Sequence, residues 1–364
     1  MRKFIKKIHK WLGLAFGVII FIVCFSGALL VFQDEIQEIA NHERYFTKPD
    51  NRQPIALNEL IQIVNEQLPD NKVKDVKISS DSTRTYAMGL AKGFRVTAYV
   101  DQYTGKIREV YSYRDSSFFF IMKLHRWFLD DSRTWGKYVV GISTLVFAII
   151  LITGVIIWYP KTKKPTKRNF IIDTKSGTKR LIRDLHSVLG LYAFIILFIG
   201  SATGLMWSFE WYRNGVFKIF GAEVEANTNK KDNKSANNTK DFNLDYFIWQ
   251  KVVENITLQN PDFNYVKIKE GSVDVQAGIS SYSKEYDNYK YDQSGEISDI
   301  LLYKNQDKVS KIWAWTHALH LGDFWGIWSK ILTFIAGLIG AMLPVTGYYL
   351  WWLKRKAKKV KKAA

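Results

Sequence analysis

Residues 178–209 read TKRLIRDLHSVLGLYAFIILFIGSATGLMWSF, a basic flank followed by a histidine and an apolar run. The run that His186 opens is long enough to cross a bilayer, which takes about 20 residues. Residues 2–32, RKFIKKIHKWLGLAFGVIIFIVCFSGALLVF, repeat the pattern in constant register, with His9 in place of His186. We interpret the two stretches as copies of one membrane helix with a histidine near its N-terminal end.

Glycines keep the same register in both copies. Gly27 and Gly204 each follow the histidine by about five helical turns, so histidine and glycine share one face. Gly13 and Gly190, one turn after the histidines, lie on it too. A face with an imidazole and little bulk predicts room for a large flat ligand. The alternative is that these glycines are only contact points between helices, where small residues are common.

Four apolar stretches have the length of a membrane span. They cover residues 11–32, 138–159, 186–209 and 328–353, and two long polar segments separate them in pairs. This pattern predicts an α-helical membrane protein with a four-helix bundle.

The net charge of +18 comes from three short basic segments. Residues 1–10 carry five Lys and Arg, residues 160–185 carry nine with two Asp, and residues 353–364 carry seven. The rest of the chain is close to neutral, so the basic excess does not indicate a nucleic-acid partner. In a four-span topology all three segments lie on one side, and the positive-inside rule assigns that side to the cytoplasm. We therefore expect both termini inside and both long polar segments outside.

The first span could instead be a cleaved signal peptide. Its apolar run is longer than a typical signal peptide needs, and no small-residue cleavage site follows it before Gln33. Its likeness to the third span also favours a retained helix. Cys24, the single cysteine, lies in mid-span and is interpreted as packing, since no Cys-x-x-Cys-His motif for covalent haem is present.

Each long polar segment has the order helix, then strands. In the second segment, residues 223–240 read as a flexible loop before that order begins. The sequence therefore predicts two small α+β domains on the outer side and an internally duplicated chain. The predicted helices are residues 56–68 and about 244–257, and the predicted strands are 74–79, 85–90, 94–100 and 106–111, then 265–269, 272–278, 284–291 and 296–303.

The second and fourth spans also follow histidines, His125 in KLHRW and His320 in ALHLG. One continuous helix from His125 to Tyr159 would run about 50 Å, longer than a hydrocarbon core of about 30 Å. We therefore expect His125 on a short interfacial helix that turns near residues 130–132. The two spans end on Thr153-Gly154 and Thr346-Gly347.

The histidines pair under this duplication, His9 with His186 on the inner side and His125 with His320 on the outer side. Histidines at membrane depth are costly and indicate function. Two imidazoles facing each other suit a low-spin haem iron with both axial positions filled, which transfers electrons rather than binding oxygen. Two such haems, one near each face, would conduct electrons across the membrane.

Plainer interpretations exist for each residue of this set. A lone interfacial histidine is usually an amphipathic anchor, and a bare metal-ion site is less well supported because no carboxylate or cysteine accompanies the histidines. His317 lies three positions before His320, so either could be the ligand, and we favour His320. His42 we assign to the surface. Arg126, Lys10 and Arg183 could pair with haem propionates or be ordinary interfacial residues.

The chain carries no dinucleotide fingerprint, P-loop or nucleophile motif. Its longest cytoplasmic connection, residues 161–185, is too short for a flavin or nicotinamide domain. Electrons would therefore have to come from a separate, unidentified donor.

The motifs HKWLGL, LHRWF, HSVLGL and LHLGDFWG, together with DQYTG at residues 101–105, resemble the PepSY-associated transmembrane family over nearly the whole chain. The resemblance implies bacterial inner-membrane proteins with four helices and PepSY-like periplasmic domains. Members linked to iron uptake are reductases with two haem b groups that reduce ferric siderophores. His9, His125, His186 and His320 fall on the family's histidines. The second turn, DQSG, lacks the Tyr-Thr of DQYTG, which weakens any role assigned to the second domain.

The predicted organisation follows from these observations. It comprises membrane helices at 1–33 and 186–209, PepSY-like domains at 34–115 and 210–308, interfacial helices with their spans at 116–160 and 309–353, a cytoplasmic basic loop at 161–185 and a basic tail at 354–364.

The function we expect is an oxidoreductase that carries electrons through two haems, reduces a ferric siderophore or other ferric chelate outside, and releases Fe(II). The competing hypothesis is a membrane-anchored PepSY module that binds partners or regulates proteases without redox activity. A small transporter is disfavoured because, apart from Pro344, the spans are neither broken nor polar.

Overall fold

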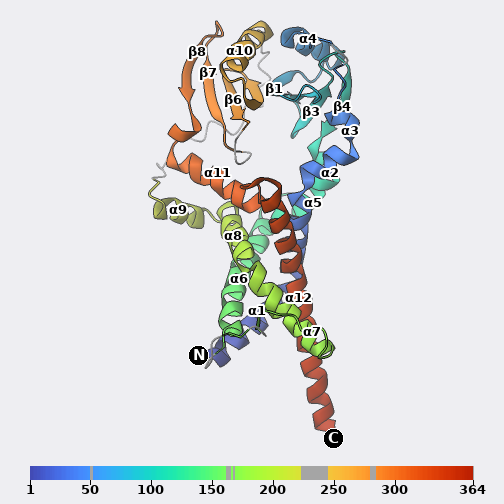
Figure 1. Ribbon diagram of the computed structural model, residues 1–364, viewed down its shortest axis with the longest axis vertical. Coiled ribbons are helices and arrows are strands. Elements are labelled where there is room, and N and C mark those ends of the chain that lie inside the picture. Colours follow the sequence, from blue (N-terminus) through green and yellow to red (C-terminus); the bar gives the residue numbers. More distant parts are fainter. Residues whose placement is uncertain (50–51, 161–164, 167–168, 223–244, 279–283, 364) are drawn as a thin grey trace. The chain divides into compact units, whose positions relative to one another are not determined.

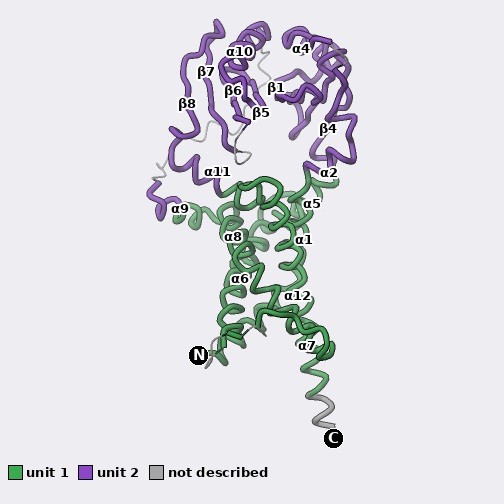
Figure 2. Tube along the Cα trace, viewed as in Figure 1, with its two compact units in different colours: residues 1–33, 117–216, 316–364 green, residues 34–116, 217–315 purple. Residues whose placement is uncertain are grey.

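The computed structural model describes residues 1–49, 52–160, 165–166, 169–222, 245–278 and 284–363. They form two compact units, which Figure 2 shows in green and purple. The helical unit comprises residues 1–33, 117–216 and 316–364, and the sheet unit comprises residues 34–116 and 217–315. The flexible loop predicted at 223–240 lies outside the described residues.

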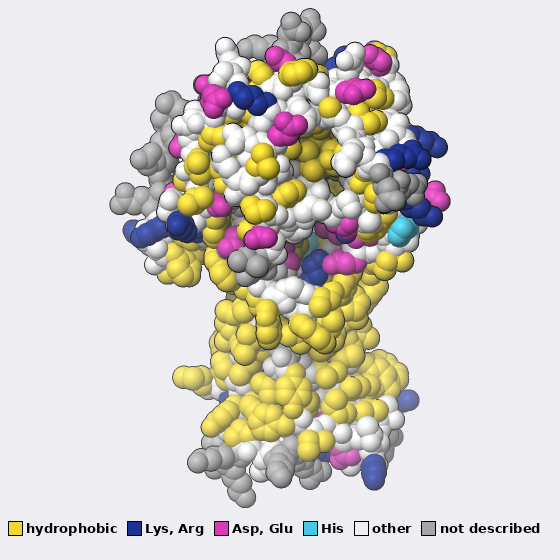
Figure 3. All heavy atoms as spheres, turned by 45° about the horizontal axis from the view of Figure 1, so that its top comes forward, with side chains coloured by type: hydrophobic (Ala, Val, Ile, Leu, Met, Phe, Trp, Pro, Cys, Tyr) yellow, Lys and Arg dark blue, Asp and Glu magenta, His cyan; other side chains and the backbone are white. Residues whose placement is uncertain are grey.

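Four long helical segments of the helical unit are apolar enough to cross a membrane. They are α1 (Arg2–Val31), α6 (Trp135–Trp158), the segment Thr178–Ser208 and the first part of α12 (Gly326–Ala363), whose spanning part is Gly326–Ala357. These four correspond to the four predicted spans, and the chain is a multi-pass membrane protein. Hydrophobic side chains, yellow in Figure 3, cover much of the surface of this unit, as expected of helices that face lipid.

The third span is not a uniform α-helix. It consists of α7 (Thr178–Asp184), a π-helical turn (Leu185–Leu189) and α8 (Gly190–Ser208). The π turn contains His186. Such turns are rare and occur frequently at functional sites, and nothing in the sequence pattern predicted this one.

Two shorter helices precede the second and fourth spans (Figure 1). They are α5 (Ser117–Trp127), which carries His125, and α11 (Lys308–Leu321), which carries His320. The chain turns sharply between α5 and α6, where Phe128, Leu129 and Arg133 adopt positive φ. This confirms the predicted short helix around His125 and the turn that follows it.

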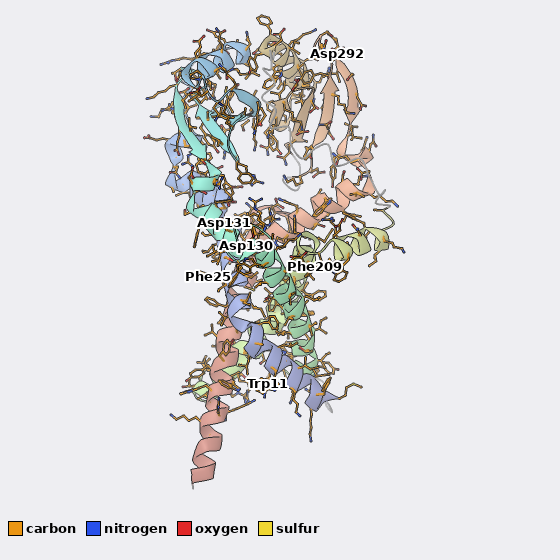
Figure 4. The ribbon with its side chains drawn as sticks, turned by 180° about the vertical axis from the view of Figure 1, so that it is seen from behind. Trp11, Phe25, Asp130, Asp131, Phe209 and Asp292 are labelled. Atoms are coloured by element: carbon orange, nitrogen blue, oxygen red, sulfur yellow. The ribbon has the colours of Figure 1, made fainter. Side chains whose placement is uncertain are left out.

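Asp130 organises that turn, and Figure 4 labels it beside Asp131. Its carboxylate accepts hydrogen bonds from the backbone N–H groups of Ser132, Thr134 and Gly136, at 2.8–3.0 Å. Burial opposes the charged form, but these donors and the Ser132 hydroxyl outweigh it and hold the pKa of Asp130 below its usual value. A Cβ on Gly136 would lie only 1.7 Å from the carbonyl oxygen of Trp127, so the turn admits glycine alone there.

The sheet unit contains one antiparallel sheet of eight strands in the order β4-β3-β2-β1-β5-β6-β7-β8. β1 pairs with β5 between Asp75–Ser79 and Tyr265–Lys269. The strands are β1 (Val73–Ser79), β2 (Tyr86–Leu90), β3 (Val96–Val100), β4 (Ile107–Ser112), β5 (Phe263–Lys269), β6 (Ser272–Ala277), β7 (Asp287–Tyr291) and β8 (Ile297–Leu301).

Two helices, α4 (Leu57–Gln67) and α10 (Tyr246–Gln259), cover one face of this sheet (Figure 1). Their apolar sides and alternate strand residues form one core, with Leu60, Ile61, Val252 and Ile256 fully buried. The remaining short elements are α2 (Gln33–Ala40), α3 (His42–Tyr45), α9 (Glu210–Ile219) and two 3₁₀ turns, Tyr113–Asp115 and Tyr303–Asn305.

The helix-then-strands order is present in both polar segments, as predicted, but the two segments are not separate. Their strands share one sheet, and their helices share one core. Local periodicity cannot predict this shared sheet. It depends on the pairing of β1 with β5, and two membrane spans separate these strands in the sequence.

Candidate functional site

The structure brings four of the six histidines together in two pairs within the helical unit. The rings of His9 and His186, the first histidine pair, have centroids 6.2 Å apart. The rings of His125 and His320, the second histidine pair, have centroids 6.0 Å apart. The pairing is the one predicted from the repeat.

Each ring of the first pair is held by a neighbouring helix through its Nδ1 atom. Nδ1 of His9 lies 3.1 Å from the carbonyl oxygen of Ile150 and 3.1 Å from the hydroxyl of Thr153, both on α6. Nδ1 of His186 lies 3.1 Å from the carbonyl oxygen of Leu343 and 2.8 Å from the hydroxyl of Thr346, both on α12.

The second pair repeats this arrangement on α1 and α8. Nδ1 of His125 lies 2.9 Å from the carbonyl oxygen of Val23 and 3.5 Å from the hydroxyl of Ser26. Nδ1 of His320 lies 3.1 Å from the carbonyl oxygen of Gly200 and 3.0 Å from the hydroxyl of Thr203.

All four contacts follow one rule, and we call each such group a histidine seat. A seat is a carbonyl, a hydroxyl residue three positions later and a glycine four positions later, on one turn of helix. The seats are Ile150–Thr153–Gly154 for His9, Val23–Ser26–Gly27 for His125, Leu343–Thr346–Gly347 for His186 and Gly200–Thr203–Gly204 for His320.

The glycine of each seat lets the imidazole come close to the helix. A Cβ on Gly27 would lie 2.8 Å from Cε1 of His125, and one on Gly204 would lie 3.2 Å from Cε1 of His320. The corresponding distances are 3.3 Å at Gly154 and 3.6 Å at Gly347. Gly27 and Gly204, which the repeat aligns, therefore do face imidazoles. These imidazoles belong to His125 and His320, not to His9 and His186.

The seats fix the tautomer of each histidine. A carbonyl oxygen can only accept a hydrogen bond, so Nδ1 must carry the proton and donate it. The seat hydroxyls donate to carbonyls of their own helices, as Thr153 does to Ile149, and so can accept from Nδ1. Each Nε2 is then left with a free lone pair, which is the state a metal ligand requires.

The spacing within each pair fits an iron held between two imidazoles. A metal–imidazole nitrogen bond is about 2 Å long, so ring centroids on opposite sides of one metal are roughly 6 Å apart. Both pairs have this separation. A Cβ on Gly13 or Gly200 would meet no atom within 4 Å, so the helix surface beside each pair is partly open. A Cβ on Gly190, the counterpart of Gly13, would instead lie 3.3 Å from the Leu343 side chain.

The two pairs lie at different depths along the bundle. On α1, Val23 of the His125 seat follows His9 by about four helical turns, or about 21 Å of helix. In the third span, Gly200 of the His320 seat follows His186 by the same number of residues. An apolar cluster that includes Ile20, Phe147 and Leu197 packs in the middle of the bundle. Cys24 is partly buried against this cluster, as the packing interpretation predicted.

The other predicted residues lie in less specific surroundings. His317 is on α11, and it is His320, not His317, that faces His125 and occupies a seat. Arg126 is exposed, with its guanidinium 5.0 Å from the Trp127 ring. His42 is exposed and stacks on Phe46 in the sheet unit, in agreement with its assignment to the surface. Lys10 lies 4.2 Å from the Trp11 ring, and Arg183 lies 3.6 Å from the carboxylate of Asp184.

The surroundings of the histidines can also be compared with those of a bare metal-ion site in the described part of the chain. There, no three or more His, Cys, Asp or Glu side chains lie close enough together to hold a metal ion. The donor set of each pair is two neutral imidazoles, which suits a porphyrin-bound iron that needs only two axial ligands.

Sequence reasoning found the histidines but missed the seats. The sequence pattern identifies Thr153-Gly154 and Thr346-Gly347 only as span ends. It assigns Gly27 and Gly204 to the faces of His9 and His186, whereas they face His125 and His320, and it gives Ser26 and Thr203 no role. The recurring Ser/Thr-Gly dipeptide in all four spans was the available signal. It is short and common in membrane helices, so it gains meaning only when the partner histidine is placed against it.

Four membrane helices with two histidine pairs between them, joined to an antiparallel sheet unit, define the class of the molecule. The model of the PepSY-associated TM region matches residues 6–354, and the chain belongs to this family. No curated protein matches the chain.

Proposed function

We propose that this protein carries electrons across the membrane through two haem b groups and reduces a ferric chelate, such as a ferric siderophore. His9 and His186 would ligate one haem iron, and His125 and His320 the other. The four histidine seats are the observation that supports this proposal most directly. They give four imidazoles the same tautomer and set them in pairs at the spacing of two axial ligands.

The proposed role as an electron carrier depends on each haem iron having two histidine ligands. A haem held by both histidines of a pair would supply reversible one-electron chemistry and would leave oxygen no place to bind. The protein's part is to hold the imidazoles rigidly, to keep each Nδ1 protonated, and to exclude water with the apolar cluster in the middle of the bundle.

The orientation and the partners belong to the same proposal. The positive-inside rule assigns the basic termini to the cytoplasm and the sheet unit to the periplasm. The helices lie in the bacterial inner membrane. Electrons come from a separate donor on the cytoplasmic or membrane side, and each one converts one Fe(III) of the chelate to Fe(II). The matching seats on α1 and α8, and on α6 and α12, also support an internal duplication.

An absorption spectrum of the purified protein, oxidised and then reduced with dithionite, tests the proposal together with a pyridine-haem count. We expect a low-spin b-type spectrum and about two haems per chain. His186→Ala and His320→Ala should each remove about one haem, and His42→Ala should remove none.

A colourless protein from haem-replete cells would refute the redox proposal. The competing function, a membrane-anchored PepSY module without redox activity, would then be the better explanation, since that function needs only the sheet unit and its anchors.

A further inference from the structure

The sheet has a polar face on the side away from α4 and α10. Residues alternate along each strand, so Val76 and Ile78 point into the core while Asp75 and Lys77 point the other way. On β5, Ile268 is likewise fully buried. The polar residues of β1, β5 and β6 therefore form one continuous polar surface, which we call the polar sheet face. They include Asp75, Lys77, Tyr265, Lys267, Lys269 and Asp274.

Two lysines face each other at the centre of this surface. Lys77 of β1 is the direct partner of Lys267 in the β1–β5 pairing. Like charges placed directly opposite in a sheet are destabilising. Lys77 and Lys267 lie where β1 joins the first half of the sheet to β5 of the second half. A neutral residue at either position would make the β1–β5 pairing more stable.

The neighbouring charges compensate one of these lysines but not the other. Lys267 lies 3.1 Å from the carboxylate of Asp75, and Lys269 lies 3.6 Å from that of Asp274. For Lys77, no carboxylate of the described residues lies within 4.0 Å. Its Nζ atom sits instead 4.0 Å from the centre of the Tyr265 ring.

Lys77 is accessible and yet poorly solvated. Its side chain is exposed, but desolvation lowers its pKa, with further lowering by Arg84 and Lys267 and partial compensation by Asp34 and Glu38. An exposed ammonium group without a close counter-ion can bind an anion from solution.

We propose that Lys77, Lys267 and Tyr265 form a binding site for the anionic oxygen atoms of the ferric chelate. The proposal rests on the proposed function, and it specifies the substrate class as a negatively charged chelate. The Lys77 ammonium can hold a carboxylate or a catecholate oxygen. Lys267, although ion-paired with Asp75, adds positive charge across the strand pair, and the Tyr265 ring borders the site beside the Lys77 ammonium. The carboxylates of Asp34, Glu38 and Asp75 offset part of the positive charge of the site. We therefore expect an anion to bind by direct contact with Lys77 rather than by general charge attraction.

The test is a binding measurement on the full-length, oxidised protein in detergent, without a reductant. Ferric citrate serves as the anionic probe, a neutral ferric trihydroxamate as the uncharged probe, and titration calorimetry gives Kd. We expect Lys77→Gln to weaken ferric citrate binding about tenfold or more, since hydrogen bonds to charged groups are stronger than those between neutral groups. Binding of the neutral probe should change much less.

Lys290→Gln is the matched control. Lys290 is also a sheet lysine, but it forms an ion pair with Asp299 at 2.9 Å. An equal loss in Lys77→Gln and Lys290→Gln would mean general charge attraction and would overturn the proposal, as would unchanged binding in Lys77→Gln.

The haem spectrum of each variant separates this proposal from the proposed function. We expect the spectrum to be identical in wild type and Lys77→Gln. If a haem-free protein still bound ferric citrate through Lys77, the redox proposal would fail while the anion site stood. A normal haem count with no binding of either probe would refute the anion site alone.

Discussion

The Nδ1 hydrogen bonds of the four paired histidines go to backbone carbonyls that are already inside helices. In a helix, each such carbonyl also accepts from the N–H four residues later, and its second lone pair is usually shielded by side chains. Placing glycine at that later position removes the Cβ that would block an approaching imidazole. The hydroxyl of Ser or Thr, one residue before, adds a second acceptor. These requirements explain why the seats share one pattern.

Loss of a seat hydroxyl should weaken the proposed haem site while leaving all four histidines in place. In Thr153→Val, the shape is kept but Nδ1 of His9 loses one of its two acceptors. Removing a partner of this kind typically costs about 10–100-fold in metal affinity. We expect slower haem incorporation and a shifted midpoint potential for one haem only, measured by redox titration.

Thr144→Val on the same helix is the control. The Thr144 hydroxyl donates to the carbonyl of Val140 and belongs to none of the four seats. If both variants shifted the potential equally, or if neither did, the seat hydroxyl would have no specific effect on the haem.

A methyl group on Gly27 should displace His125. The added Cβ would lie 2.8 Å from the imidazole, closer than carbon atoms ordinarily approach. We expect Gly27→Ala to retain about one haem per chain, by the pyridine-haem count, because the His9 and His186 site is not touched. Retention of both haems would show that α5 can move away from α1 while His125 still binds the haem iron, and would contradict this prediction.

At the scale of elements, the turn between α5 and α6 positions His125 relative to its span. We expect Asp130→Ala to lower the thermal unfolding midpoint and the haem content much more than Asp131→Ala. Asp130 accepts from three backbone N–H groups that would be left unpaired. Asp131 is largely exposed and forms a surface ion pair with Lys123, which contributes little to stability. Equal effects in the two variants would contradict this role of Asp130.

The shared core of the sheet unit makes α4 essential to both halves of the sheet. Leu60 is fully buried there, and Leu→Ala at such sites costs about 2–5 kcal/mol. We expect Leu60→Ala to lower the unfolding temperature clearly in a thermal melt of the full chain in detergent. Leu258→Ala, at a residue that is 82% exposed on α10, should leave it nearly unchanged.

Elements with strong local signals were predictable from the sequence. The four spans, the α5 turn, the helices near 56–68 and 244–257, and all eight strands were expected close to their observed bounds. The pairing of His9 with His186 and of His125 with His320 followed from the repeat. The π turn at His186, the seats and the β1–β5 junction did not follow, because each depends on which distant segment packs there.

At the scale of the whole molecule, the orientation in the membrane can be measured directly. We replace Cys24 by Ala and introduce a single exposed cysteine, either Ser82→Cys in the sheet unit or Lys356→Cys in the basic end of α12. An impermeant maleimide should label Ser82→Cys from the periplasm and Lys356→Cys only after the inner membrane is opened. The reverse labelling would contradict the positive-inside assignment.

The β1–β5 pairing also constrains the order in which the chain can be assembled during synthesis. Ser79 ends β1, but its partner strand is not complete until Lys269 has been made, after two more membrane spans. At about 5–20 residues per second, the delay is roughly 10–40 s. Throughout that time the edge of β1 lacks its partner, and an open edge is a template for wrong pairing. The half-sheet made first is therefore exposed to wrong pairing until the third span and the second segment have been made.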